Sequence, residues 1–425
     1  MSKTLKWDIE QRCNLNCRHC RSGKQIRKEN LGLFEYQQLI KKIYDMGFNK
    51  LVFTEKEPLM NKNLLNIMLE CKKLGIKCSM VTNGILFNQE KLKKFSEIGI
   101  DEIFISLEGW TESDNDYVRG KGVFKRVTSI LDFIQKSNML INVFIQLDVT
   151  NLNYFKIREF ISFFNKYSNI SIIVSIIAPI GNAEDNKELL IKNENYNYFK
   201  SEILKLKKSK KLIPDVIFSF GGPFNNIYYN LIGLSNDEIC YSDCDLNDNG
   251  FTLQPDGSVV KCSALIGTEL EKKFNNNLGF LNDYSENITY EKPVCNDYKN
   301  NSQCKVCIFR NNCCLCYIMQ FNEILNVYLN DCKYHMKEII NIIFKIISNR
   351  NRFKINGNVL VEIEEQNTRI FRYYDNIVNF INISNLLANK VKKYYGNEYM
   401  YFDNTRDLFI SDIINLVFHD LIIIE

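Results

Sequence analysis

The sequence predicts an α/β protein: a partial (β/α)6 barrel, followed by a cysteine-rich domain and a small α+β module at the carboxyl end. Three observations predict this arrangement. Short β-rich runs alternate with segments of helical period up to about residue 220, ten of the 15 cysteines lie between residues 240 and 332, and a hairpin pattern begins after residue 350. The expected domains span residues 1–225, 226–345 and 346–425.

The first part of the chain repeats a strand and a helix. The six expected strands are 4–9 ("TLKWDI"), 50–54 ("KLVFT"), 76–82 ("IKCSMVT"), 102–107 ("EIFISL"), 141–149 ("INVFIQLDV") and 170–177 ("ISIIVSII"). Parallel strands need crossover helices, so this alternation predicts a parallel sheet wound as a partial barrel. Functional groups in such a sheet gather at the carboxyl ends of the strands.

Composition narrows the class of protein. The 425 residues are 45% hydrophobic, which is enough for packed cores in more than one domain. A net charge of +4, from 54 basic and 50 acidic residues, is too small to predict a nucleic-acid partner. No secretory signal and no apolar run of about 18 residues is present, so we expect a cytoplasmic protein with no membrane span. In a reducing compartment, clustered cysteines are more often metal ligands or catalytic groups than disulfides.

Cys13, Cys17 and Cys20 lie directly after the first expected strand, at the functional end of the sheet. Three thiolates on one loop can hold three irons of a cubane cluster and leave the fourth iron without a protein ligand. The alternative is a zinc site, for which His19 is the available fourth ligand.

This C-x3-C-x2-C loop resembles the signature of the radical S-adenosylmethionine (SAM) enzymes. The resemblance implies that the open iron of a 4Fe-4S cluster chelates the amino and carboxylate groups of SAM. One electron then cleaves the sulfonium, and the 5′-deoxyadenosyl radical abstracts a hydrogen from the substrate. It further implies a flavodoxin- or ferredoxin-like electron donor.

Two positions near the loop are assigned by the same resemblance. His19 takes the place of the residue beside the adenine, with a surface imidazole as the alternative. In "FTEKEPL", Glu57 and Pro58 match the family's Gly-Gly-Glu-Pro segment, whereas Glu55 and Lys56 replace its two glycines. By resemblance Glu57 accepts a hydrogen bond from the methionyl amine; the alternative is a charge at a helix N-terminus.

Segments after later strands supply the remaining expected contacts to SAM. "VTNG" and "ISLEG" resemble family segments that nominate Asn83 and Ser106, the latter for the methionine carboxylate or the ribose. "DNDYVRGKG" nominates Arg119, whose guanidinium can clamp that carboxylate with two parallel hydrogen bonds. Taken alone, Asn83 fits an ordinary turn. Gln146 and Asp148 share a face near the end of the fifth strand, either as substrate-facing groups or as plain polar residues.

The ten cysteines between residues 240 and 332, here called the second cysteine field, resemble the SPASM extension, which holds two auxiliary 4Fe-4S clusters. By resemblance the ligands of the first are Cys240, Cys244, Cys262 and Cys316. Those of the second are Cys304, Cys307, Cys313 and Cys332. Two residues separate Cys313 from Cys316 where three are usual, so Cys314 is an alternative ligand. A zinc ribbon over 304–316 is the other possibility, since C-x2-C pairs suit tetrahedral zinc.

Three features remain. Cys71 and Cys78 are expected to pack as small buried side chains. In the tail, "VLVEIEE" and "TRIFRYYD" predict a hairpin, followed by helix-like "NIVNFINISNLLANKVKKYYG" and "DLFISDIINLVFHDLII". This α+β module faintly resembles a leader-peptide recognition module, in which an edge strand receives a peptide as an added strand. A structural cap or a dimerisation element is the alternative.

Enzymes of the resembled architecture act mostly on peptides or protein side chains. The leading hypothesis is therefore a maturase that abstracts a hydrogen from a ribosomally made precursor peptide and installs a thioether, carbon-carbon or related cross-link. One alternative is an anaerobic sulfatase-maturating enzyme that forms formylglycine. Another, from a different class, is a non-catalytic iron-sulfur electron carrier or redox sensor.

Overall fold

The structure, a computed structural model, describes residues 3–25, 29–137, 139, 141–208, 216–219, 250–285 and 288–289, and the strands 352–355, 359–363, 368–374, 377–383, 400–401 and 422–424. Of the predicted auxiliary ligands, only Cys262 belongs to this part of the chain. Outside it lie Cys240, Cys244, Cys295, Cys304, Cys307, Cys313, Cys314, Cys316 and Cys332.

The barrel strands form one parallel array, and each predicted strand is present. In chain order they are β1 (Thr4–Asp8), β2 (Lys50–Thr54), β3 (Lys77–Thr82), β4 (Glu102–Ser106), β5 (Asn142–Val149), β6 (Ile170–Ile176) and β7 (Val216–Ser219). Each pairs in parallel with the next, so sequence order and spatial order coincide. The predicted α/β class is thus confirmed, with β7 as a seventh parallel strand.

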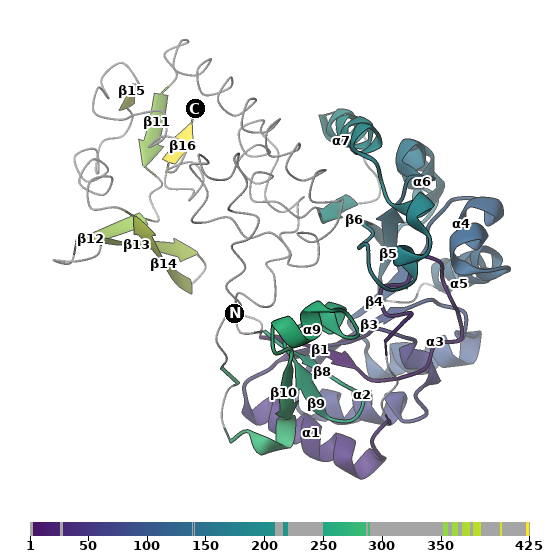
Figure 1. Cartoon of the computed structure of the whole chain (residues 1–425), viewed down its shortest axis with the longest axis horizontal. Helices are drawn as coiled ribbons and strands as arrows, with labels where there is room; N and C mark the ends of the chain where they lie inside the picture. Colours follow the sequence, from purple (N-terminus) through teal and green to yellow (C-terminus); the bar gives the residue numbers. More distant parts are fainter. Residues whose placement is uncertain are drawn as a thin grey trace.

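Helices connect these strands and cover one face of the curved sheet (Figure 1). They are α1 (Leu33–Asp45), α2 (Leu64–Lys73), α3 (Gln89–Ile98), α4 (Glu112–Arg119), α5 (Val123–Lys136), α6 (Ile157–Phe164) and α7 (Asn193–Lys208). In α1 the buried side chains are Tyr36, Leu39, Ile40 and Ile43, the spacing of a single helix face. No helix in the described ranges has both the length and the apolar character needed to span a membrane.

The strand register separates an apolar outer face from a more polar inner face. Trp7 and its neighbour Phe53 lie under α1, where the Trp7 ring meets Tyr36 edge to face at 5.7 Å. Cys71 and Cys78 belong to the same fully buried layer, which confirms their predicted packing. Because side chains alternate along a strand, the next pair, Asp8 and Thr54, must face the opposite side.

The inner face has an apolar floor and a polar rim. Phe104 and Phe144 are register partners whose rings stack at 4.8 Å. Two residues further along the same strands, Ser106 pairs with Gln146, and Asp148 pairs with Ser175 on β6. Polar groups therefore gather where the strands end, as predicted, and Gln146 and Asp148 share one face.

A hairpin from later in the chain extends the sheet beyond β1, drawn in green in Figure 1. β8 (Thr252–Leu253) runs parallel to β1, and β9 (Ser258–Val260) and β10 (Asn277–Phe280) follow antiparallel, which makes the ten-stranded sheet mixed. The sheet thus continues past residue 225, where we expect the first domain to end. The domain limits themselves stay predictions.

The tail contains two small antiparallel sheets. β12 (Val359–Ile363) and β13 (Thr368–Tyr374) pair as the predicted hairpin, which is confirmed. The helical prediction for the following segment is wrong at its start, because β14 (Ile377–Ile383) pairs along the full length of β13. The β-branched run of this segment favours a strand once a partner edge is available. β11 (Arg352–Ile355) pairs with β15 (Met400–Tyr401) and β16 (Ile422–Ile424); β16 is a strand at the end of the last helix-like segment.

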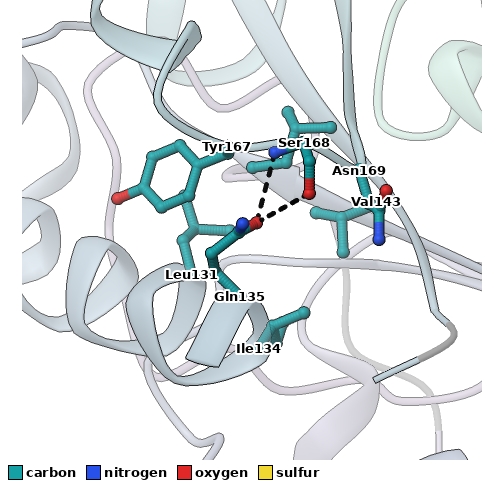
Figure 2. Close-up of a pocket in the computed structure, with 8 residues that line it drawn as sticks. Leu131, Ile134, Gln135, Val143, Tyr167, Ser168 and Asn169 are labelled. Carbon is teal, nitrogen blue, oxygen red and sulfur yellow. Dashed lines mark hydrogen bonds between the residues drawn. The ribbon is translucent and has the colours of Figure 1, made fainter. Parts of the chain in front are cut away.

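One cavity at the amino end of the barrel is small. A cavity of about 20 Å³ lies between α5 and the start of β6, which is room for about one water molecule. Figure 2 shows Gln135 reaching across it, where its Oε1 accepts from the backbone N and from the Oγ of Ser168, both at 3.2 Å.

Candidate functional site

The loop after β1 brings the three predicted cluster cysteines together. Within the described part of the chain, Cys13, Cys17 and Cys20 form no disulfide. Burial raises the pKa of Cys17 to about 11, and the neighbouring Cys20 and Cys13 add to the rise despite the opposing charge of Arg119. Burial likewise raises the pKa of Cys13, to which Cys20 contributes. The thiols are thus close enough to interact, and metal binding must displace their protons.

Hydrogen-bond donors face two of these sulfurs. The Cys13 Sγ accepts from the backbone N of Leu15 at 3.5 Å and from Asn83 Nδ2 at 3.8 Å. The Cys17 Sγ lies 4.0 Å from Arg119 Nη1, which donates toward it. Donors aimed at sulfur stabilise thiolate ligands and tune the clusters they hold. The donor set therefore fits an iron-sulfur cluster on three cysteines.

A turn after β6 clamps the loop, and sequence reasoning missed it. Asn182 donates its backbone N to the Cys20 carbonyl at 2.9 Å and its Nδ2 to the Cys17 carbonyl at 2.9 Å. Asn186 Nδ2 reaches the Arg18 carbonyl at 3.1 Å. Gly181 comes so close that an added Cβ would lie under 3.0 Å from loop carbonyl oxygens. The "GNAEDN" segment, a glycine followed by two asparagines after a strand, was the available signal.

Beside the loop, four charged side chains form a buried network. His19 Nε2 lies 3.2 Å from Glu108 Oε1 and 3.5 Å from Asp148 Oδ2. Arg119 Nε donates to the same Glu108 oxygen at 2.9 Å. The second Glu108 oxygen accepts from the backbone N of Asp148 at 2.8 Å. Glu108, which the sequence analysis did not nominate, thus connects His19, Arg119 and β5.

The network balances its own charge. Burial lowers the pKa of His19, but the Glu108 charge and hydrogen bonds to both carboxylates outweigh this and raise it to about 9. Burial raises the pKa of Asp148, yet the hydrogen bond from His19 helps to lower it to about 2. Two cations therefore face two carboxylates at neutral pH. The donor atoms of His19, Glu108 and Asp148 lie within 4.8 Å of one another, but Arg119 and protonated His19 already supply the positive charge that a metal ion would bring.

The carboxylates of Glu108 and Asp148 occupy only the Nε2 of His19. The side chain is buried, and among the described residues its Nδ1 has no hydrogen-bond partner. A buried imidazole nitrogen without a partner is uncommon and indicates a position that a ligand completes. Its place beside adenine stays a prediction.

Glu57 and Asn83 form the floor under the loop. The fully buried Glu57 carboxylate accepts from Thr82 Oγ1 at 2.7 Å, from the backbone N of Asn83 at 2.9 Å and from that of Leu59 at 3.0 Å. Its last contact caps a short 3-10 helix, η1 (Pro58–Met60), as the alternative for Glu57 predicted. Asn83 Nδ2 donates to Asn14 Oδ1 at 2.8 Å, so Asn83 joins β3 to the loop. Contacts of either residue with SAM stay predictions.

The two residues that replace the family glycines have identifiable partners. Glu55 keeps a left-handed backbone, with φ of 58°, which a glycine would adopt without strain. Its buried carboxylate pairs with Arg21 and accepts from Ser263 Oγ at 3.0 Å. Lys56 donates to the Ser22 carbonyl. The substitutions therefore join the end of β2 to the cysteine loop and to the segment after β9.

That segment carries Cys262, the one predicted auxiliary ligand among the described residues. Its backbone N donates to Asn276 Oδ1 at 3.0 Å, and its side chain is close enough to raise the pKa of Arg21. Arg21 directly follows Cys20. The chain thus brings one residue of the second cysteine field near the first.

A comparison with protein families supports this geometry. Residues 9–164 match the model of the radical SAM superfamily. This part of the chain is a radical SAM domain. The match begins directly after β1 and ends with α6, so it includes the cysteine loop, Glu57, Asn83, Ser106 and Arg119.

Two curated relatives that match part of the chain carry different names. An Fe-coproporphyrin III synthase of Methanosarcina barkeri is 36% identical over 121 residues, which is 28% of this chain and 30% of that protein. An AdoMet-dependent heme synthase of Oleidesulfovibrio alaskensis is 26% identical over 157 residues, 36% of this chain and 40% of that protein. The chain thus spans less than half of each relative.

Solved structures share the fold. Native anSMEcpe with bound AdoMet superposes with a TM-score of 0.58 at 18% identity, covering 81% of this chain and 100% of that one. SuiB of Streptococcus suis bound to its precursor peptide SuiA superposes with a TM-score of 0.53 at 16% identity, covering 75% of this chain and 72% of that one. At these identities the likeness is one of fold.

Proposed function

We propose that this protein is a radical SAM enzyme that modifies a ribosomally made peptide by forming a cross-link. Cys13, Cys17 and Cys20 would hold a 4Fe-4S cluster, which when bound supplies the electron that cleaves SAM. Asn83 and Arg119 orient the sulfurs, Glu108 holds His19 and Arg119 in place, and the unpartnered His19 Nδ1 is a donor available to SAM.

One observation carries the proposal: three thiols converge at the carboxyl end of a parallel sheet, beneath N–H donors and beside a neutral buried network. A structural zinc site would require a fourth ligand, and the Nε2 of His19 is directed at Glu108 and Asp148, which leaves only Nδ1 for a metal. An electron carrier would need no unpartnered donor beside its cluster. The arrangement favours a site that receives a further ligand.

A peptide substrate is supported by the second cysteine field and by the solved structures. Both SuiB and anSMEcpe have been solved with bound peptides. In this chain, the tail sheet of β12, β13 and β14 has edge strands that suit addition of a peptide strand. We propose the tail as the recognition module, with a cap as the alternative.

The first test measures iron and sulfide, with Mössbauer spectra, in protein purified without oxygen. We expect about twelve irons per chain, falling to about eight when Cys13, Cys17 and Cys20 are all changed to alanine. The control changes Cys71 to alanine, which removes a buried thiol far from the loop in sequence. About four irons with stoichiometric zinc would contradict the auxiliary clusters.

The second test distinguishes the alternatives. Incubation with SAM and a reductant releases methionine and 5′-deoxyadenosine only if the chain is an enzyme. If neither product forms, the electron-carrier hypothesis is favoured. A cross-link on a precursor peptide encoded beside the gene supports the proposal, and formylglycine on a sulfatase peptide supports sulfatase maturation. Because two relatives are named as synthases of Fe-coproporphyrin III and of heme, formation of either product is the third outcome to assay.

A further inference from the structure

A second carboxyl group on the inner face is not explained by the SAM site. Asp8 ends β1, and the register with Thr54 puts it on the face opposite the helix layer. It is 3% exposed. One of its oxygens, Oδ2, accepts from Gln254 Nε2 at 2.9 Å, whereas the buried Oδ1 has no hydrogen-bond partner among the residues that the structure describes. A buried carboxylate oxygen without a donor is costly, so its retention calls for a cause.

Asp8 and Glu55 are neighbouring carboxyl groups in opposite environments. Glu55 is paired with Arg21 and with Ser263, and the Arg21 charge lowers its pKa against the effect of burial. Asp8 has one neutral donor. Burial, followed by the negative charge of Glu55, raises the pKa of Asp8 well above its ordinary value, against smaller effects of Gln254, Arg21 and Lys56. Two carboxyl groups whose pKa values are driven apart are the usual arrangement of an acid-base site.

We propose that Asp8 is the proton acceptor of the peptide-modifying reaction, with Oδ1 as the accepting atom and Glu55 remaining ionised. This inference rests on the proposed function. Joining two peptide side chains removes two hydrogens. One leaves as a hydrogen atom to the SAM-derived radical; the other leaves as a proton and an electron.

The proton transfer balances as follows. The substrate S–H, O–H or C–H bond breaks, and an O–H bond forms on Asp8, which passes from carboxylate to carboxylic acid. The electron passes to an oxidised iron-sulfur centre. A carboxylate whose ordinary pKa has been raised by burial is a stronger base than a solvated one. Oδ1 is open to this role because no donor from the described part of the chain competes for it.

The hairpin gives Asp8 its one hydrogen bond and so controls its basicity. Gln254 follows β8, which pairs with β1, so the donor reaches Asp8 from the segment that leads to Cys262. Removing that hydrogen bond raises the pKa of Asp8 further. Only the carboxylate form of Asp8 accepts a proton. The fall in the rate of product formation at low pH therefore begins at a higher pH.

The test uses the anaerobically reconstituted full chain and the precursor peptide. In Asp8→Asn we expect 5′-deoxyadenosine to form while cross-linked product falls by about 10²- to 10⁴-fold, the usual contribution of a general base. Gln254→Met should keep product formation and shift its acid limb to higher pH. Asp45→Asn, on the exposed end of α1, is the matched control. Wild-type product formation by Asp8→Asn across the pH range overturns the proposal.

An infrared titration separates this proposal from the proposed function, because it needs no turnover. The resting protein should show the carbonyl stretch of a protonated carboxyl at a pH where ordinary aspartates are ionised, and Asp8→Asn should remove it. If no peptide is modified but this band is present, the peptide function fails and the proton-holding site stands. If the band is absent, or persists in Asp8→Asn, Asp8 is not the proton acceptor. Should Asp8→Asn not fold, the Gln254→Met shift decides.

Discussion

Replacing Gly181 with alanine tests whether the turn after β6 holds the cysteine loop. Gly181 has φ of +63° and begins a 3-10 helix, η3 (Gly181–Glu184). An added Cβ would lie under 3.0 Å from the carbonyl oxygens of Cys20 and Arg21. The turn cannot retreat freely, because the next residue, Asn182, donates to the Cys20 carbonyl at 2.9 Å. The methyl group must therefore displace the loop.

The free-energy cost of Gly181→Ala has two parts, which a control variant can separate. A left-handed backbone costs alanine about 1–2 kcal/mol relative to glycine. Overpacking against fixed backbone atoms adds about 1–3 kcal/mol. Gly99, at the end of α3, has φ of +77° and open space around the added Cβ, so Gly99→Ala carries the first part alone. The expected difference between the variants is the overpacking part.

Two measurements check this reasoning. Urea unfolding should give Gly181→Ala a free energy of unfolding lower than that of Gly99→Ala by about 1–3 kcal/mol. Iron analysis after anaerobic reconstitution should show a loss of up to about four irons per chain in Gly181→Ala, and none in Gly99→Ala. Equal stability of the two variants, with full iron in both, would refute the clamp.

Three further substitutions probe the site. Glu57→Gln replaces one carboxylate oxygen with an amide donor beneath three N–H and O–H groups, so urea unfolding should show a loss of about 1–3 kcal/mol. The exposed Glu90→Gln loses only its surface pair with Lys94 and should cost much less. Arg21→Met leaves the buried Glu55 carboxylate without its cation and, because Arg21 is itself half exposed, should cost about 1–3 kcal/mol at neutral pH. Because Arg21 lowers the Glu55 pKa, the pair's stabilisation exists above the unfolded carboxyl pKa of about 4.3 and is lost as pH falls; a deficit unchanged on acidification would contradict this. Asn182→Ala should reduce iron retention with little change in far-ultraviolet circular dichroism; full retention would argue against its role.

Local patterns determined much of the fold. The six barrel strands and their crossover helices follow from hydrophobic periods, because a strand that is apolar on its helix side and a helix with one apolar face each fit a single arrangement. The cysteine loop was also readable, since Cys13, Cys17 and Cys20 are close in sequence and any turn after β1 keeps them together. The wrong helix prediction at β14 also reflects the use of local patterns. A strand that forms because it pairs with a neighbouring strand has no local signal that separates it from a helix.

Contacts between distant segments were decided only by the tertiary structure. The sequence shows Glu55 in place of a glycine, but its partners Arg21 and Ser263 stand 34 and 208 residues away. Asp8 looks like an ordinary strand residue until Gln254, 246 residues later, approaches from the added hairpin. The charge state of such groups depends on burial and on neighbours brought by the fold, whereas periodicity depends on residues next in sequence. The sequence by itself therefore determined where the chemistry lies, and the tertiary structure decided which charges surround it.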